Sequence, residues 1–415
     1  MEDIRLRRPD RDQLLMEPVH LEGLLPADHE ARAIWAVTGR LDLSGFMESI
    51  KSRGENAGRP TADPRLLLAL WLYATKEGVG SGRELERRCQ HHDAYRWLCG
   101  GVPVNYHTLN DFRVAHERAL DALMTQVLTA LVHQEVVTVN RISQDGTRVR
   151  ASAGKKSFRR RNRLEMLREE MAMHIQTLKQ QMAMPLPNAA RQRREAEDRL
   201  ARVEKALDTI KTLEGAKAAQ KDKPSKRRLP RASTTDADAR IMRMGDGGYR
   251  PAYNVQFAVD PASRAIVGVD VTNSGSDANE SVGMRQQVER RTGGRVTEHL
   301  MDGGYVKLKA IERAESRGVR VYAPMPKPKR ADVDPYAARS GDGPGVRQWR
   351  ERMRSPEAKA IYRQRAATVE TVNADVKAHR GLTQFRVRGL PRVRCVTLLV
   401  ALTYNLMHFG RDLLG

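Results

Sequence analysis

Two consecutive stretches of alternating apolar residues constrain the fold of this chain most, because side chains that alternate in this way line one face of a β-strand. The first stretch is RPAYNVQFAVD at residues 250–260, and the second is AIVGVDVTN at residues 265–273. The turn sequence DPAS, at residues 260–263, separates them. The pair predicts an antiparallel β-hairpin, so the chain must contain a sheet with at least one buried face.

Strands and helices alternate around this hairpin. Apolar runs bounded by glycine, proline or aspartate predict further strands, which cover residues 135–153, 296–301 and 319–324. Apolar residues at three- and four-residue steps predict helices, which cover residues 277–291, 307–317, 355–379 and 396–409. We therefore expect a mixed α/β fold, in which a sheet of mixed strand directions carries helices on its faces.

Residues 21–133 predict a region of short helices joined by tight turns. Asp63 and Pro64 supply a helix N-cap and a first-turn proline before a long apolar stripe. Ser81 stands at capping-box spacing before a glutamate, and Thr108 is expected to begin a further helix. Three interpretations of this region stay open: a helix-turn-helix that reads DNA, a domain for dimerisation or for binding DNA ends, and a purely structural cap.

A basic insertion is predicted between the first strand and the hairpin. Two amphipathic segments, residues 164–182 and 200–213, are expected to pack as an antiparallel helical pair that turns at residues 185–188. Residues 215–232 then form a basic linker. Arginine and lysine side chains suit the phosphates of the DNA backbone. The cluster at the start of the insertion supplies candidate DNA contacts, namely Lys155, Lys156, Arg159, Arg160 and Arg161.

The charge balance points to a polyanionic partner. The chain has 73 Lys and Arg residues against 51 Asp and Glu residues among 415, a net charge of +22. Nucleic-acid phosphate is the usual partner of such a surface, because neutralising it releases counterions. A soluble basic protein without such a partner is the alternative. Cys89, Cys99 and Cys395 are too few for a disulfide framework and lack paired metal-ligand spacing, so a reduced protein without a zinc site is expected.

The sequence shows no membrane or export signal of the usual kind. The first 25 residues mix acids, bases and prolines rather than forming a signal peptide. The longest apolar runs, at residues 66–74 and 395–406, are shorter than the roughly 20 residues that a membrane span needs. We therefore expect a cytoplasmic protein, associated with the nucleoid and not with a membrane.

Three acidic residues that are far apart in the sequence are the candidate catalytic groups. Asp145 lies in the first strand, Asp302 follows the strand 296–301, and Glu370 lies in the helix 355–379. In chain order, the strand at 135–153 is the first predicted strand and that at 296–301 the fourth. If these two strands are adjacent, the two aspartates meet, and the helix 355–379 brings Glu370 onto them. Three carboxylates without a basic partner repel one another and need shared cations, for which hard oxygen ligands select Mg²⁺ or Mn²⁺. Two such ions, about 3.5–4 Å apart, activate a water or a 3′-hydroxyl and stabilise the leaving oxygen of a phosphodiester.

Each acid also has a plain structural interpretation. Asp145 and Asp302 each precede a glycine and fit simple turns, and Glu370 fits the exposed face of a charged helix. Asp375 is the nearest rival carboxylate to Glu370. On a regular helix it points about 140° away, so both cannot be ligands of one ion.

Several motifs together resemble those of one protein family. They are SQDGTRVRASA (143–153), GYRPAYNVQFAVD (248–260), VTNSGSDANES (271–281), LMDGGY (300–305), the helix of Glu370 and FRVRGLPRV (385–393). The leading helices, with ADPRLLLALWLYA and NYHTLNDF, share the likeness, which thus covers nearly the whole chain. The chain resembles a bacterial insertion-sequence transposase of the DDE type, in the broad IS-four/IS-five superfamily and most like its eleven-eighty-two family.

The resemblance implies a fold and an activity. It implies a ribonuclease-H-like catalytic fold in which Asp145, Asp302 and Glu370 bind two Mg²⁺ or Mn²⁺ ions. The substrate would be double-stranded DNA, both the terminal inverted repeats of the element and the target, with cleavage followed by strand transfer. A homo-oligomer on DNA is expected. The alternatives are a catalytically inactive DNA-binding regulator derived from a transposase, and a nuclease of the same fold.

The superfamily's signature around the glutamate is present with one departure. It has Tyr, Arg, Glu and Lys with two, three and six residues between them, and here these positions are Tyr362, Arg365, Glu370 and Lys377. Four residues separate Arg365 from Glu370, one more than in the signature, whereas the gap from Glu370 to Lys377 fits. The resemblance implies that Tyr362, Arg365 and Lys377 contact DNA.

These expectations divide the chain into five regions. A flexible arm (1–20) is followed by an N-terminal helical domain for DNA binding or dimerisation (21–133). The first part of the catalytic domain (134–154), the basic helical-hairpin insertion with its linker (155–235), and the remainder of the catalytic domain with a C-terminal helix (236–415) complete the chain.

Overall fold

The structure is a computed structural model that describes most of the chain. The described residues are 12, 18–48, 50, 61–181, 189–218, 229–328, 330 and 332–414. The predicted arm 1–20 lies outside the described residues except for residues 12 and 18–20, and so do the predicted turn at 185–188 and most of the linker 215–232.

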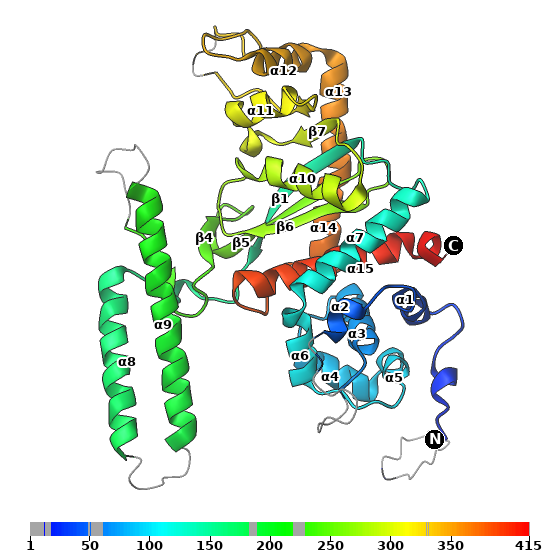
Figure 1. Cartoon of the computed structure of the whole chain (residues 1–415), viewed down its shortest axis with the longest axis vertical. Coiled ribbons are helices and arrows are strands. Elements are labelled where there is room, and N and C mark those ends of the chain that lie inside the picture. Colours follow the sequence, from blue (N-terminus) through cyan, green and yellow to red (C-terminus); the bar gives the residue numbers. More distant parts are fainter. Residues whose placement is uncertain are drawn as a thin grey trace, which may run out of the picture.

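A six-stranded mixed sheet forms the centre of the fold (Figure 1). Its strands are β1 (Arg141–Arg150), β4 (Arg240–Arg243), β5 (Tyr249–Val259), β6 (Ile266–Thr272), β7 (Glu298–Met301) and β8 (Arg320–Tyr322). The order across the sheet is β4, β5, β1, β7, β8, with β6 paired to β5. β5 is antiparallel to β1, β4 and β6, whereas β7 is parallel to β1 and to β8. The predicted hairpin is confirmed as β5 and β6, and the predicted adjacency of the first and fourth strands as β1 and β7.

Helices pack on this sheet as the mixed α/β pattern predicts. They are α10 (Glu280–Thr292), α11 (Leu308–Glu315), α12 (Pro344–Arg354), α13 (Pro356–Arg365), α14 (Thr371–Ala378) and α15 (Leu390–Leu414). α10 and α15 contact β6, and α13 contacts β7 and β8. Between α13 and α14, the π-helical turn η5 (Ala366–Glu370) contacts β1 and β5. Because β5 is covered on both faces, its polar residues Asn254 and Gln256 are as buried as its apolar ones.

The N-terminal region is helical, and its helix starts follow the predicted caps. The elements are η1 (Leu21–Leu24), α1 (Glu30–Thr38), α2 (Ser44–Met47), α3 (Pro64–Lys76), α4 (Gly82–His91), α5 (Asp93–Cys99), α6 (Tyr106–Ala115) and α7 (Glu117–His133). Asp63 caps α3 by accepting a hydrogen bond from the backbone N–H of Arg65 at 2.8 Å, and Ser81 caps α4. The prediction for Thr108 is wrong by one turn: Asn105 is the cap, and its Oδ1 accepts from the N–H of Thr108.

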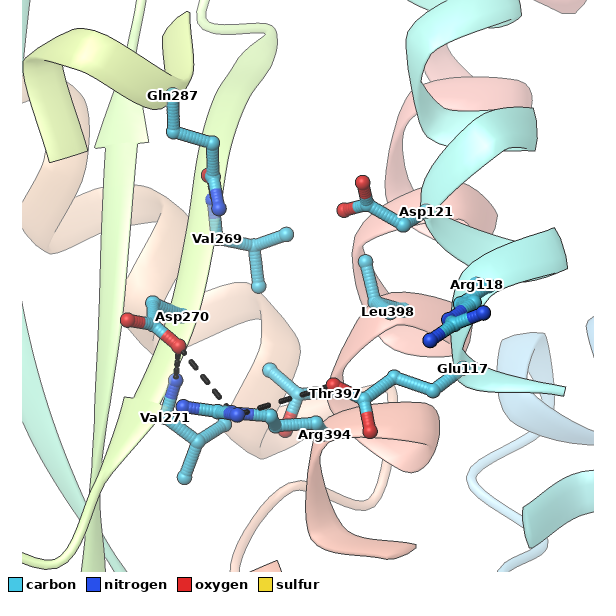
Figure 2. A pocket seen from close by; sticks show the side chains of 10 residues that line it. All are labelled: Glu117, Arg118, Asp121, Val269, Asp270, Val271, Gln287, Arg394, Thr397 and Leu398. Carbon is cyan, nitrogen blue, oxygen red and sulfur yellow. Dashed lines mark hydrogen bonds and ion pairs between the residues drawn. The ribbon is translucent and has the colours of Figure 1, made fainter. Parts of the chain in front are cut away.

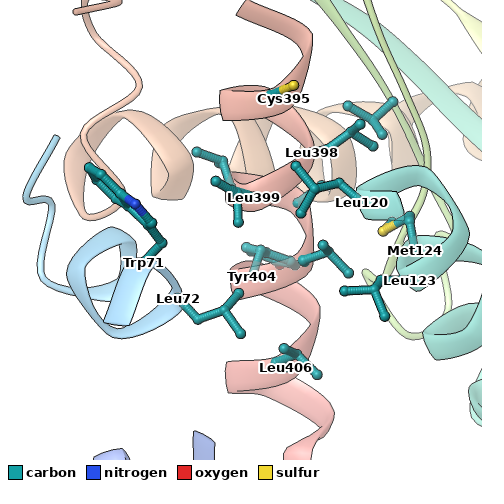
Figure 3. Close-up of a cluster of buried hydrophobic side chains, with 14 of the residues drawn as sticks. Trp71, Leu72, Leu120, Leu123, Met124, Cys395, Leu398, Leu399, Tyr404 and Leu406 are labelled. Atoms are coloured by element: carbon teal, nitrogen blue, oxygen red, sulfur yellow. The ribbon is translucent and has the colours of Figure 1, made fainter. Parts of the chain in front are cut away.

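The long helix α15 joins the N-terminal helices to the sheet through one hydrophobic core. Figure 3 shows its apolar residues between Trp71 and Leu72 of α3 on one side and Leu120 of α7 on the other. By length and composition α15 is the one helix among the described residues that could cross a membrane, but 67% of its most apolar window is buried inside the protein. Full burial of a leucine-sized side chain contributes about 1.5–3 kcal/mol, so α15 is held in place as a core helix.

The predicted basic insertion is a helical hairpin that stands apart from the sheet (Figure 1). Its helices are α8 (Arg161–Gln181) and α9 (Ala189–Ala218), which pack on each other along their length. Small apolar clusters hold the pair, one of them formed by Leu164 with Val203 and Leu207. At its base, η2 (Lys155–Ser157) leads into β2 (Phe158–Arg159), which pairs with β3 (Ala232–Ser233).

One helix was not predicted from the sequence. Residues 325–345 were expected to form a loop, and α12 begins at the end of that stretch, with Pro344 in its first turn. Val346, Trp349 and Met353 are its buried face, and Trp349 is fully buried. The helix has few apolar residues and several arginines, so its sequence does not show a clear apolar stripe.

Stability should depend on pH through His299. This residue lies on β7, and neither ring nitrogen has a partner among the described residues. Burial, with the charge of Arg285 beside it, lowers the pKa of His299 to about 3. In the unfolded chain a histidine titrates near about 6.5, so between these values only the unfolded state takes up the proton. As the pH falls through that window, the free energy of unfolding should drop by about 1.4 kcal/mol per pH unit from this group.

Urea unfolding of the wild type and of His299→Leu, each at about pH 7 and about pH 5, measures this contribution. Other groups also titrate, so the quantity of interest is the difference between the two proteins. We expect the variant to lose less stability than the wild type on acidification. Equal losses would show that His299 is protonated in the folded protein.

Candidate active site

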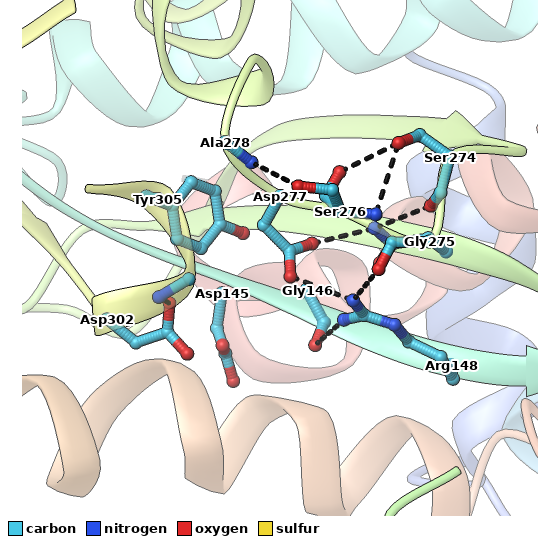
Figure 4. A network of polar contacts seen from close by, with 12 residues as sticks. Asp145, Gly146, Arg148, Ser274, Gly275, Ser276, Asp277, Ala278, Asp302 and Tyr305 are labelled. Atoms are coloured by element: carbon cyan, nitrogen blue, oxygen red, sulfur yellow. Dashed lines mark hydrogen bonds and ion pairs between the residues drawn. The ribbon is translucent and has the colours of Figure 1, made fainter. Parts of the chain in front are cut away.

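The pairing of β1 with β7 places Asp145 and Asp302 next to each other. The last pair in register between these parallel strands is Gln144 with Met301, and each aspartate is the next residue of its strand. Figure 4 shows the two carboxylates side by side below the sheet. Asp302 also accepts a hydrogen bond from the N–H of Gly304 at 2.8 Å, which begins the short 3₁₀ turn η4 (Gly303–Tyr305). The structure therefore brings two of the predicted acids together.

Glu370 approaches from the helical side and is held by an arginine. It is the last residue of η5, which packs on β1, and its Oε1 accepts from an N–H of Arg365 at 2.6 Å. The other terminal nitrogen of Arg365 lies 3.5 Å from Oδ1 of Asp145. Arg365 thus links Asp145 and Glu370. The expectation of three carboxylates without a basic partner is wrong, because this guanidinium supplies one.

The π-helical turn explains how Arg365 reaches Glu370. On a regular α-helix, residues five apart point about 140° away from each other. A π turn accommodates one extra residue in a helix, which brings the fifth residue round to the position of the fourth. The gap of four residues in this chain, one more than in the signature, is therefore absorbed by η5 (Ala366–Glu370), so that Arg365 reaches Glu370.

Burial controls the protonation of Asp145. Desolvation raises its pKa to about 6, the charge of Arg365 opposes this rise, and the charges of Asp302 and Glu370 add to it. Asn373, on α14, donates a hydrogen bond to its Oδ2 at 2.9 Å. Burial also lowers the pKa of Lys377, although the charge of Asp145 works against that. Near neutral pH, Asp145 is therefore mostly ionised, and its buried charge is stabilised by Arg365.

The donor chemistry of the site suits a hard divalent cation, since Asp145, Asp302 and Glu370 all offer carboxylate oxygens. In the described part of the chain, however, no group of three or more His, Cys, Asp or Glu side chains is already gathered as a metal site. Glu370 turns to Arg365 instead. The rival Asp375 forms an ion pair with Arg380 at 3.3 Å, so it is committed elsewhere.

Asp277, a buried acid beside the site, was not among the predicted site residues. Its Oδ1 accepts from the side-chain amides of Asn254 and Gln256, both at 2.7 Å, and its Oδ2 accepts from Arg148 at 2.9 Å. A side chain at residue 146 would meet Asp277 at 2.5 Å, so only glycine fits after Asp145. The sequence features that correspond to this network are the motif VTNSGSDANES and the polar residues of β5. Because these residues pair between different elements, no local pattern predicts the contact.

The same network reaches the second aspartate. Tyr305, which ends the turn after Asp302, donates its hydroxyl proton to Oε1 of Gln256. Gln144 on β1 donates to the same oxygen at 3.0 Å. Figure 4 shows Asp277 and Arg148 joined by this polar layer, with Tyr305 beside it. The network thus fixes the strand and the turn that carry Asp145 and Asp302.

The basic cluster lies away from these elements, at the base of the helical hairpin. Lys155 and Lys156 are exposed on η2, and Arg159 and Arg160 follow on and after β2. Arg161 begins α8 and is neutralised by ion pairs with glutamates of α8 and α9. Its charge is therefore used within the hairpin.

A separate hollow lies between α7, β6 and α15 (Figure 2). It has a volume of about 380 Å³, and charged residues make up half of its lining. Arg394 lies between Asp270 at 3.4 Å and Glu117 at 3.8 Å, and Asp121 pairs with Arg291. These charges neutralise one another across the contact between the N-terminal helices and the sheet, so this hollow holds no catalytic set.

Two regions of the chain match known protein families. Residues 229–406 match the Transposase DDE domain, and residues 19–115 match the Transposase domain (DUF772). Together the matches support an insertion-sequence transposase. The chain has no significant match among curated proteins or among solved structures.

Replacing Asp277 should destabilise the protein strongly. Asp277→Ala leaves Arg148 and two buried amides without their acceptor, and uncovering a buried charge in this way costs about 3–5 kcal/mol. Urea unfolding measures the loss. Asp246→Ala is the matched control, because Asp246 pairs with Arg250 at an exposed turn, and its unfolding midpoint should stay near that of the wild type. A variant of Asp277 as stable as this control would contradict the structural role of the network.

Shortening the π turn should be tolerated. Deleting Ala367, an exposed residue of η5, converts the turn to regular α-helix and restores the three-residue gap of the signature. Deleting Ala374 in α14 instead rotates one side of that helix by about 100° and pulls a buried valine from the core. Thermal unfolding followed by circular dichroism should show a near-wild-type midpoint for the first deletion and a clear drop for the second. Equal drops would mean that η5 does not absorb an extra residue.

Proposed function

We propose that this protein is a DDE transposase, which binds insertion-sequence ends and catalyses metal-dependent DNA cleavage and strand transfer. The two transposase-domain matches support this function. The helical N-terminal region and the mixed sheet are compatible with it, and we assign the sheet region to a ribonuclease-H-like fold. We place the chain in the IS-four/IS-five superfamily, nearest its eleven-eighty-two family, and expect it to act in the cytoplasm, at the nucleoid, as a homo-oligomer on DNA.

The observation that carries the proposal is the meeting of distant acids on one sheet. Asp145 and Asp302 end a run of paired residues on adjacent parallel strands, and Glu370 comes from the helix packed on β1. These three residues would hold Mg²⁺ or Mn²⁺. Such ions would supply an activated water or 3′-hydroxyl and would stabilise the leaving oxygen of the phosphodiester.

The chain's own residues prepare the site for charge. Arg365 pairs with both Asp145 and Glu370, which offsets part of the repulsion among the acids. Gly303 and Gly304 follow Asp302 without side chains, which lets a DNA backbone approach its carboxylate. For all three acids to share cations, Glu370 must release Arg365, whose guanidinium then becomes free to bind a phosphate oxygen. Tyr362 and Lys377, on the same helical stretch, are the neighbouring candidate DNA contacts.

One observation favours the alternative of a protein that binds DNA without cutting it. Glu370 is paired with Arg365 rather than gathered with the two aspartates. If that ion pair holds on DNA, the site keeps only two carboxylates and cannot complete the set. A nuclease that cleaves without joining is the other alternative, and product analysis distinguishes it.

Substitution of each acid tests the proposal. The substrate is a labelled duplex containing the DNA just outside the reading frame, where inverted repeats are expected, and the products are resolved as cleaved and joined strands in Mg²⁺. Asp145→Ala, Asp302→Ala and Glu370→Ala should each lower cleavage by on the order of 10³-fold, since metal-ion stabilisation contributes several kcal/mol, and should leave DNA binding intact.

Asp375→Ala is the matched control, because it removes an acid from the same helical stretch that is paired with Arg380. It should retain activity near that of the wild type. Cutting by all three acid variants would refute the assignment of the site. A wild type that binds but neither cuts nor joins would favour the inactive regulator, and cleavage without joining would favour the nuclease.

A further inference from the structure

The segment after α14 carries arginines in a strand-like alternation. In FRVR, residues 385–388, Phe385 and Val387 are buried while Arg386 and Arg388 are exposed. The segment lies along the end of β1: the N–H of Phe385 donates to the carbonyl of Arg150 at 2.8 Å, and Gln384 forms a parallel bridge with the same residue. The two arginines are therefore held on the outer side of an ordered edge, not on a free loop.

These arginines line two adjoining hollows between this segment and the N-terminal helices. The hollows have volumes of about 240 and 330 Å³ and share Arg113 and Arg386 in their walls. We call this surface the arginine groove and define it by Arg113, Arg150, Arg386, Arg388 and Arg392. Asp111, which is exposed, is the one carboxylate in its lining.

The five arginines that define the groove lack acidic partners within the described part of the protein. None of these five arginines forms an ion pair with a described Asp or Glu, whereas a sixth arginine of the lining, Arg380, pairs with Asp375. The Nε–H of Arg388 donates a hydrogen bond to the carbonyl of Ser152 at 3.2 Å, and its two terminal nitrogens remain available for another acceptor. A concave surface with several unpaired cations attracts anions strongly.

Arg113 is the deepest of the five. It is only 6% exposed, lies over the ring of Trp71, and donates to the carbonyl of Gly80 and to Asn110, while its Nε has no partner. Burial, together with the charge of Arg386, lowers the pKa of Arg113 to about 10. A buried guanidinium that faces a second cation without an acid between them is strained electrostatically, and an anion in the groove would relieve that strain.

We propose that the arginine groove binds backbone phosphates of the DNA that the candidate active site acts on. This inference rests on the proposed function for its choice of ligand, since the groove itself requires only a polyanion. Arginines spread along a channel match the repeated phosphates of a duplex better than they match one small anion.

The groove lies at a distance from the acids that suits a bound duplex. Arg150 follows Asp145 by five residues on β1, which corresponds to about 16 Å of strand. Lys377 lies in α14, and Arg380 follows the end of that helix. A span of about 16 Å equals roughly five base-pair steps of a duplex. A duplex with a phosphodiester at Asp145 and Asp302 is long enough to span this distance, and it would have to pass round the end of β1, because side chains five residues apart on a strand point to opposite faces.

The test compares two double variants with equal loss of charge. Arg386→Ala/Arg388→Ala removes the exposed arginines of the groove, and Arg313→Ala/Arg317→Ala removes two exposed arginines on and after α11, at the other end of the molecule. Binding to a short fluorescein-labelled duplex is followed by anisotropy over a series of salt concentrations in EDTA. Without metal ions no cleavage occurs, so a failure of the catalytic assignment leaves this result unaffected.

We expect the groove variant to bind about 10- to 100-fold more weakly at about 0.1 M salt and to lose about 2 from the slope of log K against log salt, because each phosphate contact contributes about 0.9. The α11 variant should stay close to the wild type. Arg386→Lys/Arg388→Lys should recover most of the slope, since lysine keeps the charge, and this recovery would distinguish phosphate binding from a structural role.

Two outcomes would overturn the proposal. Equal weakening in the groove and α11 variants would show that only net charge matters. Unchanged duplex binding by the groove variant, with inorganic phosphate raising the thermal midpoint of the wild type but not of this variant, would assign the groove to a small free anion. Unchanged circular dichroism and thermal midpoints confirm that the variants are folded.

Discussion

The candidate site depends on the pairing of β1 with β5 on one side and with β7 on the other. The parallel register with β7 sets Asp145 beside Asp302, and the antiparallel register with β5 sets Gly146 opposite Gln256. A slip of one residue would turn every side chain of β1 to the other face. Such a slip would bury Asp145 where Gly146 now fits and would separate the two acids. The buried network around Asp277 makes that slip costly, because it pairs only with this register.

Charge is balanced differently in the two polar layers of the site. The layer around Asp277 is complete, since an arginine and two amides satisfy its carboxylate. The layer of Asp145, Asp302 and Glu370 is incomplete, because one guanidinium serves acids on two elements, and burial raises the pKa of Asp145. A satisfied network is rigid, and an under-neutralised one can accept a cation. The layer around Asp277 therefore holds the strands in place, and the layer of Asp145, Asp302 and Glu370 is the one that can bind a cation.

Local signals in the sequence predicted the elements that carry the acids, but not their partners. The hairpin, the strands of Asp145 and Asp302 and the caps of α3 and α4 depend on neighbouring residues, and they were predictable. The extra residue before Glu370 was also visible, yet its consequence was not, because the π turn is held by packing of Thr368 and Val369 on the sheet. The links from Arg365 to Asp145 and from Asp277 to Arg148 join residues more than a hundred positions apart, and no local pattern predicts such contacts.

The core around α15 ties the arginine groove to the candidate active site. Arg113 belongs to α6, whereas Arg386 and Arg388 precede α15, and both α6 and α15 pack into the core that also contains α3 and α7. Close-packed interiors deform little, so the N-terminal helices cannot shift far relative to the sheet. An anion held between α6 and the FRVR segment would thus lie at a fixed distance from Asp145. The N-terminal helices would contribute to DNA binding as one wall of that groove, whether or not they also read a sequence.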